Sequence, residues 1–232
     1  MVTATDRSPS VTVLVAAYNE APVISGVVRT ALQAVPSGEV LVVDDGSTDG
    51  TAQTAAAAGA RVLQLAANGG KGSALRQGLR AAQGEVIVLI DGDGQDDPAE
   101  IPRLLQALVP EVDLVIGSRF IGHFEPGAIT PVNRFGNRFL TSVINLLFST
   151  ALTDTQAGFK ALRADMLRRI ELRAKRFDIE VDVLLGVLRA GGRIVEIPVR
   201  RAPRQHGESR LNSLIDGARI LRRIVARRFG LG

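Results

Sequence analysis

Short apolar runs rich in β-branched residues alternate with helical stretches over the first half of the chain, and this alternation restricts the possible folds more than any other feature. Strands that alternate with helices of roughly ten to fifteen residues, through short loops, indicate a mainly parallel sheet with helices on both faces. The expected strands are Val11–Ala17, Glu39–Asp44, Arg61–Leu65, Val86–Ile90 and Val112–Ile116. We therefore expect an α/β fold.

The fourth apolar run leads directly into an acidic turn, VIVLIDGDGQDDP at residues 86–98. Asp91, Asp93 and Gln95 alternate with glycines, so several oxygen ligands lie on one tight turn. Hard cations such as Mg²⁺ and Mn²⁺ bind such oxygens and usually complete their coordination with substrate phosphates. The other interpretation is a solvated turn that opens a helix, with an aspartate cap before Pro98.

Polar residues also follow the other expected strands. The carboxyl ends of parallel strands form the ligand-binding edge of an open α/β sheet, which favours a metal site at the acidic turn. Asp44 or Asp45 could accept hydrogen bonds from a nucleotide base or ribose, or cap the following helix. Lys71, flanked by glycines that permit close backbone approach, could meet a phosphate or be solvated. The other polar segments are Tyr18–Glu20 and Ser118–Arg119.

Composition excludes several kinds of site. Cysteine is absent from the 232 residues, so disulfides, thiolate metal sites and a catalytic cysteine are impossible. Two histidines are too few for a histidine-based zinc site without carboxylates. Met1–Ser10 is polar, and no stretch approaches the ~20 apolar residues of a membrane span, so we expect neither a signal peptide nor a spanning helix.

Positive charge is concentrated at the end of the sequence. Nine arginines follow position 199, against only Glu208 and Asp216. A basic segment can serve nucleic acid, an anionic membrane or a phosphorylated substrate. We do not expect nucleic acid, because one tyrosine and no tryptophan leave few rings to stack on bases, and carboxylates crowd the strand ends.

Two amphipathic helical patterns occur in the second half. Residues 131–150 place Phe135 and Phe139 on one face, and residues 211–229 carry an apolar stripe flanked by arginines. The stripe can pack on the sheet, lie on an anionic bilayer or form a dimer contact. Its members are Leu211, Leu214, Ile215, Ala218, Leu221, Ile224 and Val225. The other expected elements are a helix over 177–188, whose Glu180 and Asp182 lie on its surface or in structural pairs, a strand over 193–199 that Pro198 ends, and a basic loop over 200–210.

Six motifs keep one order along nearly the whole chain. They are AAYNE (16–20), VVDDGSTDGT (42–51), NGGKGSALRQG (68–78), DGDGQDDP (91–98), GSRF (117–120) and DTQAGFK (154–160). Each is weak alone, but together they resemble family 2 glycosyltransferases. More narrowly, they resemble the polyprenyl-phosphate sugar synthases, the group of dolichyl-phosphate mannose synthase and undecaprenyl-phosphate glucosyltransferase. The chain departs at Ala16, where the family usually has proline, and in stopping after one amphipathic helix where many relatives continue into membrane helices.

The resemblance implies a GT-A fold, which is a Rossmann-like, mainly parallel sheet with helices on both faces, here followed by a C-terminal amphipathic helix. It implies a single domain over 1–232, with a nucleotide-sugar half over about 1–120 and an acceptor half over about 121–232. Tyr18, Glu20 and Asp44 would hold the nucleoside. The expected donor-binding residues are Ala17, Tyr18, Glu20, Asp44, Asp45, Lys71, Asp91, Gly92 and Arg204, and the expected ligands of Mg²⁺ or Mn²⁺ are Asp91, Asp93 and Gln95.

The charge of the acceptor indicates which residues its binding site needs. A lipid phosphate is largely ionised at pH 7, with a second pKa of about 6, so it requires positive charge to hold it rather than a strong general base. Arg119, Arg134 and Arg204 are candidates, because a guanidinium binds two phosphate oxygens at once. Arg138 and His206 are weaker candidates for the same role. The expected catalytic residues are Asp93, Arg119, Arg134 and Gln156.

We expect inverting, metal-dependent transfer of one sugar from GDP-mannose or UDP-glucose to a polyprenyl phosphate. The enzyme would lie peripherally on the cytoplasmic, inner face of the cell membrane, and a homodimer is an open alternative for its exposed helix. The alternative function keeps the nucleotide-sugar donor but uses a soluble hydroxyl acceptor. That reaction demands a general base, for which Asp154 is the candidate.

Overall fold

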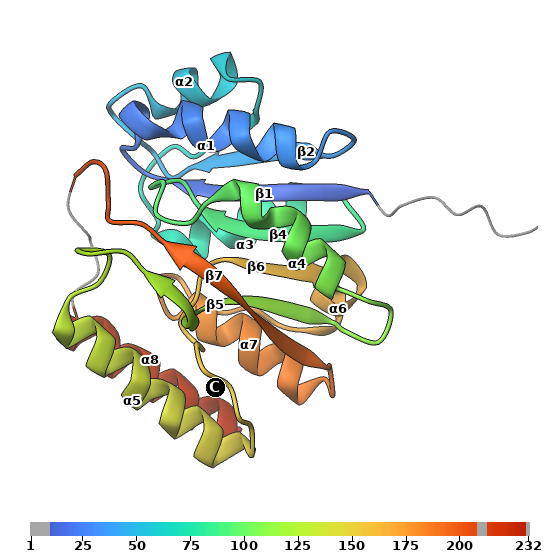
Figure 1. The fold of residues 1–232 in the computed structure, drawn as a ribbon, viewed down its shortest axis with the longest axis vertical. Helices are drawn as coiled ribbons and strands as arrows, with labels where there is room; N and C mark the ends of the chain where they lie inside the picture. Colours follow the sequence, from blue (N-terminus) through green and yellow to red (C-terminus); the bar gives the residue numbers. More distant parts are fainter. Residues whose placement is uncertain (1–9, 208–212, 231–232) are drawn as a thin grey trace, which may run out of the picture.

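The computed structural model describes residues 10–207 and 213–230. Within these residues a seven-stranded sheet has the order β3-β2-β1-β4-β6-β5-β7 (Figure 1). Its strands are β1 (Val11–Ala17), β2 (Glu39–Asp44), β3 (Arg61–Gln64), β4 (Val86–Asp91), β5 (Leu114–Phe124), β6 (Lys160–Arg163) and β7 (Ile194–Arg201). Neighbouring strands are parallel except at β6, which is antiparallel to both β4 and β5. The expected mainly parallel sheet is confirmed.

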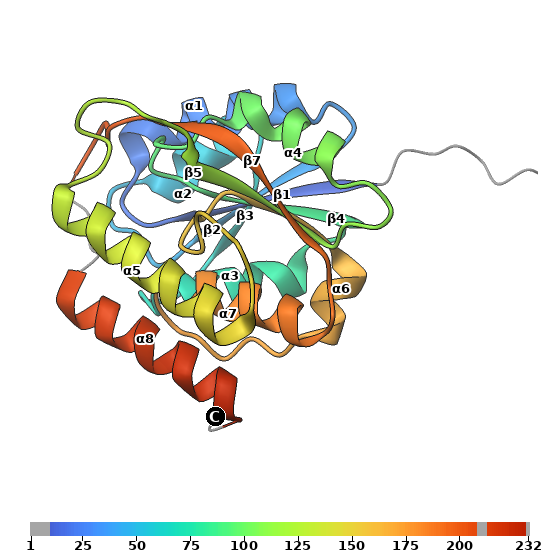
Figure 2. The ribbon, with the colours of Figure 1, turned by 60° about the horizontal axis from the view of Figure 1, so that its bottom comes forward.

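Helices cover both faces of this sheet, as expected. They are α1 (Ala21–Ala34), α2 (Thr51–Ala57), α3 (Lys71–Ala81), α4 (Ile101–Ala107), α5 (Pro131–Phe148), α6 (Ala164–Arg169), α7 (Ile179–Arg189) and α8 (Ser213–Phe229). In β1, Val13 and Val15 are buried under α1, α2 and α4, whereas Leu14 is buried under α3 and α5 to α8 (Figure 2). Successive residues of a strand point to opposite faces, so a strand covered on both sides must be apolar throughout.

Helices α5 and α8 lie side by side in both views (Figures 1 and 2). They contribute to the apolar core that contains Leu14. Ile220 and Ile224 of α8 are buried, while Ile215 and Val225 are exposed. The expected apolar stripe is therefore partly wrong: it omitted Ile220 and included two exposed residues. Helix α8 contacts α5 and α7, and its buried Ile220 and Ile224 belong to one apolar core with residues of these two helices. No helix among the described residues is long and apolar enough to cross a membrane.

Three local expectations are wrong. Pro198 does not end its strand but lies inside β7, which is an edge strand where a residue without an N–H costs no ladder bond. Strand β5 continues beyond the expected end at Ile116 to Phe124, because its last residues pair with the end of β7. The sequence pattern also missed β6 and α6.

Caps were partly predicted. The Asp97 side chain accepts a hydrogen bond from the Ala99 N–H (2.9 Å), so the expected aspartate cap before Pro98 is present, at the start of a 3₁₀ turn (Pro98–Glu100). At α2, the Asp49 carboxylate accepts from the Thr51 N–H (3.0 Å), and neither Asp44 nor Asp45 caps this helix. Met1–Pro9, the end of the expected basic loop (208–210) and the expected start of the last helix at Leu211 lie outside the described residues.

Candidate active site

A cavity of about 860 Å³ opens where the carboxyl ends of β1 and β4 meet. Helices α5 and α8 and the segment before α7 form its other walls. Most residues predicted from the sequence border it: Ala17, Tyr18, Glu20, Asp45, Lys71, Asp91, Gly92, Asp93, Gln95, Arg119, Gln156 and Arg204. Asp44 and Arg134 do not. Ligands of open α/β sheets bind at this edge, so the fold makes the cavity the candidate site.

The acidic turn is held against β1 by its backbone. The Gly92 N–H donates to the Ala16 carbonyl (2.9 Å), which extends the pairing of β1 with β4 beyond the strand. A Cβ at position 92 would lie 3.0 Å from the Ala17 Cβ, so glycine permits this close approach. The Asp93 Oδ1 atom accepts from the Gln95 N–H (3.1 Å). The turn is therefore shaped before any ligand enters.

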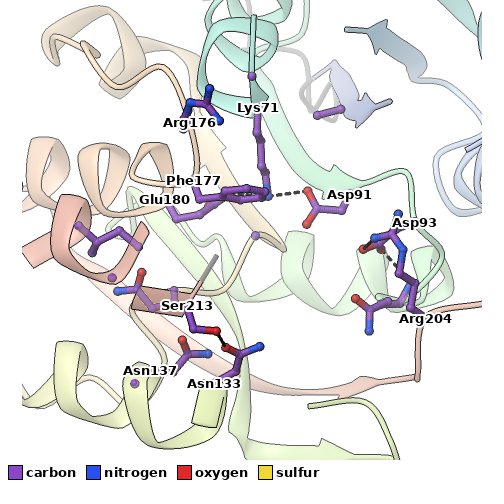
Figure 3. Close-up of a pocket in the computed structure, with 18 of the residues that line it drawn as sticks. Lys71, Asp91, Asp93, Asn133, Asn137, Arg176, Phe177, Glu180, Arg204 and Ser213 are labelled. Carbon is purple, nitrogen blue, oxygen red and sulfur yellow. Dashed lines mark hydrogen bonds and ion pairs between the residues drawn. The ribbon is translucent and has the colours of Figure 1, made fainter. Parts of the chain in front are cut away.

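Lys71 is held between two carboxylates (Figure 3). Its Nζ lies 2.5 Å from Asp91 Oδ1 and 2.8 Å from Glu180 Oε1. Burial alone would lower the pKa of Lys71, but these two carboxylates raise it above its usual value. Burial would raise the pKa of Asp91, and the Lys71 ammonium instead holds it below its usual range. Glu180 also pairs with the fully buried Lys160, so the chain's own acids neutralise both lysines.

Arg204 bridges two further carboxylates of the cavity. It pairs with Asp93 (3.0 Å) and with Glu20. Burial raises the pKa of Glu20 to about 7, although Arg204 opposes the shift and the nearby Asp93 adds to it. Burial also raises the pKa of Asp93, even though the Arg201 guanidinium attracts its charge. Burial thus disfavours the charged forms of Glu20 and Asp93 more than the nearby guanidinium groups favour them.

These oxygens fit a hard divalent cation. Asp91 and Asp93 offer carboxylates on one turn, and the buried Glu20 Oε2 atom nearby has no hydrogen-bond partner among the described residues. Gln95 lies on the same turn, although its Oε1 atom accepts from Arg201 (2.9 Å). Within residues 10–207 and 213–230, no three acidic, histidine or cysteine side chains form a metal cluster by themselves. Mg²⁺ is commonly bound by one or two carboxylates together with substrate phosphates, which is the arrangement that this donor set allows.

The two aspartates after β2 have different environments. Asp44 Oδ1 accepts from the backbone N–H (3.1 Å) and the hydroxyl of Ser47, and its buried Oδ2 has no hydrogen-bond partner. Asp45 instead accepts from the N–H groups of Gly69 (2.9 Å) and Gly70 (2.8 Å). Asp45 therefore fastens the glycine-rich loop before α3.

On the side of α5, Arg119 forms a buried ion pair with Asp154. The Arg119 Nε and Nη2 atoms donate to the two Asp154 oxygens at 2.7 and 2.8 Å, and the Arg119 backbone N–H donates at 3.0 Å. Asp154 has no exposed surface, and its own N–H donates to Glu196 (2.8 Å). Gln156 borders the cavity and donates from Nε2 to the Thr155 hydroxyl (2.9 Å). Asp154 thus orients Arg119.

The other predicted arginines contact aromatic rings. Arg134 lies 5.7 Å from the centre of the Phe124 ring, and Arg138 lies 5.5 Å from that of Phe120. These cation–π contacts place both guanidinium groups beside the outer part of β5. His206 is exposed, and its carbonyl accepts from Arg204 (2.7 Å).

The wall formed by α5 and α8 is largely apolar. This part of the lining includes Phe135 and Phe139 of α5 and Ile220 and Leu221 of α8. At the open end, the Ser213 hydroxyl donates to Asn133 Oδ1 (2.6 Å), which joins the starts of the two helices (Figure 3). An apolar cavity wall formed by two helices is suited to bind a hydrocarbon chain.

Sequence reasoning missed four charged residues around the cavity: Lys160, Arg176, Glu180 and Arg201. Glu180 was expected on a helix surface or in a structural pair, and it is both paired and part of the lining. A signal existed, because IEVDVLL places two acids in an otherwise apolar helix and buried acids must be paired. Arg201 pairs with the buried Asp96 and was hidden among the neighbouring arginines of the basic loop.

Comparison with known proteins agrees with this geometry. The model of the family described as glycosyl transferase family 2 matches residues 12–171. The undecaprenyl-phosphate mannosyltransferase of Micrococcus luteus is 38% identical over 224 residues, which cover 90% of each chain. The polyprenol monophosphomannose synthase of Mycolicibacterium smegmatis is 30% identical over 217 residues, 86% of this chain and 80% of that protein. The expected resemblance to polyprenyl-phosphate sugar synthases is confirmed.

A solved structure confirms the expected GT-A fold. Glucosyl-3-phosphoglycerate synthase from Mycobacterium tuberculosis, in complex with Mn²⁺, UDP-glucose and phosphoglyceric acid, matches with a TM-score of 0.76 and 25% identity. The match covers 97% of this chain and 81% of that one.

Proposed function

Because this chain belongs to glycosyl transferase family 2 and is therefore a glycosyltransferase, we propose that it transfers one sugar from a nucleoside-diphosphate sugar to a polyprenyl phosphate. The donor would be GDP-mannose or UDP-glucose, the reaction would use Mg²⁺ or Mn²⁺, and the anomeric configuration would invert. The names of the two mannosyltransferase relatives support the acceptor. The complex of the structural relative with Mn²⁺ and UDP-glucose supports the donor class and the metal.

The burial and hydrogen bonds of Asp154 are the main support for a phosphate acceptor. A hydroxyl acceptor needs a general base within reach, and Asp154 was the candidate. Asp154 is fully buried and accepts three hydrogen bonds from Arg119, so it is a poor base. Among the described residues, the carboxylates that line the cavity are Glu20, Asp45, Asp91, Asp93 and Glu180. Asp45 holds the loop before α3. The other four belong to the ion-pair network of the acidic turn. An ionised phosphate needs no base.

The chain's own residues would then divide the work between donor and acceptor. Asp91, Asp93 and Gln95 would hold the divalent cation, which when bound stabilises negative charge on the leaving diphosphate. Lys71, Arg201 and Arg204 are cations beside this turn. Lys71 and Arg204 pair with its carboxylates Asp91 and Asp93, and each can exchange a carboxylate for a phosphate oxygen when a diphosphate enters. Arg119, oriented by Asp154, would hold the acceptor phosphate near the anomeric carbon. Phe135 and Phe139 would take the isoprenoid chain.

The outer surface of α5 and α8 supports a peripheral position on the cytoplasmic face of the membrane. Phe135, Leu146 and Phe229 are 75%, 82% and 64% exposed. Arg222 and Arg228 are exposed beside them. Apolar side chains flanked by arginine favour the interface of an anionic bilayer. Phe135 belongs both to this exposed surface and to the cavity lining, so a lipid would enter the cavity beside Phe135 without leaving the bilayer.

A transfer assay with matched acceptors tests the function. The purified chain, Mg²⁺ and either GDP-mannose or UDP-glucose are incubated with undecaprenyl phosphate or with undecaprenol, which lacks only the phosphate. We expect a product from the phosphate alone and from one donor. Transfer to undecaprenol would favour a hydroxyl acceptor, and no product with any donor would contradict the proposal.

The variant Asp93→Asn tests the metal within the same assay. We expect the rate to fall on the order of 100-fold or more, because charge on the leaving diphosphate is no longer offset by a held cation. The melting temperature should not fall, since burial already disfavours the Asp93 carboxylate. Undiminished transfer by this variant, or by the wild type in EDTA, would refute the metal assignment.

A further inference from the structure

The cations that line the cavity differ in whether the chain already neutralises them. Within the described residues these cations are Lys71, Arg119, Arg176, Arg201 and Arg204. Four form ion pairs: Lys71 with Asp91 and Glu180, Arg119 with Asp154, Arg201 with Asp96, and Arg204 with Glu20 and Asp93. The Arg176 guanidinium forms no ion pair with any carboxylate in the described part of the chain.

Arg176 is nevertheless held in place by its backbone. Its N–H donates to Asp178 Oδ1 (3.2 Å), and Asp178 Oδ2 accepts from Arg223 of α8 (3.0 Å). The carbonyl of the preceding residue, Lys175, accepts from the Ser73 N–H at the start of α3 (3.1 Å). The segment before α7 is thus tied to both α3 and α8.

The stem of Arg176 packs on the glycine-rich loop. A Cβ at Gly70 would lie 2.7 Å from the Lys175 carbonyl oxygen and 3.2 Å from the Arg176 Cγ, so only glycine leaves room for this contact. Figure 3 shows Arg176 beside Lys71, on the same side of the pocket as Phe177. Arg176 therefore lies beside Lys71 but outside the ion-pair network of the acidic turn.

We propose that Arg176 binds a phosphate group of a substrate. The inference rests on the proposed function, in which both the donor diphosphate and the acceptor lipid carry phosphates. A guanidinium can hold two phosphate oxygens in a fixed geometry. The other four cations must first share or release a carboxylate, whereas Arg176 meets an incoming anion without breaking an ion pair. It therefore supplies positive charge to the cavity that no carboxylate of the described residues offsets.

Direct binding measurements on Arg176→Gln test this assignment. The probes are GDP and UDP with Mg²⁺ for the donor phosphates and geranyl phosphate, a soluble prenyl phosphate, for the acceptor. We expect the dissociation constant of one probe to rise about tenfold or more, as for loss of a charge-assisted hydrogen bond. A rise for the nucleotide alone assigns Arg176 to the donor, and a rise for geranyl phosphate alone assigns it to the acceptor. Arg176→Lys should recover part of the affinity, because it keeps the charge but not the fork.

Lys175→Gln is the matched control. It removes one positive charge from the adjacent exposed residue, which does not border the cavity. We expect all dissociation constants to stay within about twofold of the wild type, as for a solvated surface charge. Wild-type binding and transfer with Arg176→Gln indistinguishable from Lys175→Gln would overturn this inference alone. A wild type that binds neither nucleotide nor geranyl phosphate would overturn the proposed function with it.

Discussion

Burial of single charged residues in the cavity has a measurable cost at Glu20, even though Glu20 pairs with Arg204. Its pKa is about 7 in the folded chain, against an ordinary value of 4.5. At pH values between 4.5 and about 7, Glu20 therefore binds more protons in the folded chain than in the unfolded chain. The free energy of unfolding must therefore fall as pH rises from about 4.5 through about 7, by on the order of 3 kcal/mol for a shift of this size.

Glu20→Gln should remove this decline. We expect the variant to gain stability relative to the wild type as pH rises from 5 to 8, measured by denaturant unfolding in metal-free buffer. Glu39→Gln is the control: burial raises the pKa of Glu39, but hydrogen bonds from Arg61, Thr12 and the Gln83 N–H together lower it below its usual value, so its contribution is complete above about pH 4.5. The loss of stability in that variant should not change between pH 5 and 8. A flat difference for Glu20→Gln over the same range would contradict the account.

Helix α8 shows how an element is positioned by charge as well as by apolar packing. Arg227 donates to Asp182 of α7 at 2.5 and 2.8 Å, and Asp182 has no exposed surface. Arg227→Gln would leave this buried carboxylate without its cation. Breaking a buried pair in this way costs about 3 kcal/mol, so we expect a loss of that size in the free energy of unfolding. Arg222→Gln, on the exposed side of the same helix, should cost less than about 0.5 kcal/mol. Equal losses in the two variants would show that α8 is not anchored through Asp182.

The expected elements agree with the structure where local pattern decides the outcome. β1 and β2 match their predicted ranges, because a strand buried on both faces is marked by its own apolar run. β6 could not be predicted, since KALR is short and becomes a strand only by filling the space between β4 and β5. The residues of the cavity were largely predictable from strand ends. Their pairing was not: nothing near Lys71 in the sequence shows that Glu180 will share its charge.

On α5 and α8, which lie side by side in both views (Figures 1 and 2), exposed apolar side chains such as Phe135 and Leu146 accompany exposed arginines such as Arg222. We expect the protein to sediment with vesicles that contain phosphatidylglycerol and to bind weakly to neutral phosphatidylcholine vesicles. Leu146→Ser should weaken this binding without lowering stability, because Leu146 is 82% exposed. Binding unchanged by this substitution would contradict the orientation, and a dimer in solution that Leu146→Ser dissociates would assign the surface to a second copy.

The antiparallel strand β6 also determines the order in which the sheet can be completed. β1 to β4 pair with one another over residues 11–91, and among them β4 also pairs with a later strand, β6, so this half can form from contacts between segments close in sequence. β5 follows them in the chain but has no partner among them, since its neighbours are β6 and β7. Until residues 160–163 emerge from the ribosome, β4 ends in an open edge and β5 is unpaired, which is the condition in which strands associate wrongly. The four-residue strand β6, late in the chain, therefore completes the sheet between β4 and β5. It connects the half of the sheet that carries the acidic turn to the half that carries β5 and β7.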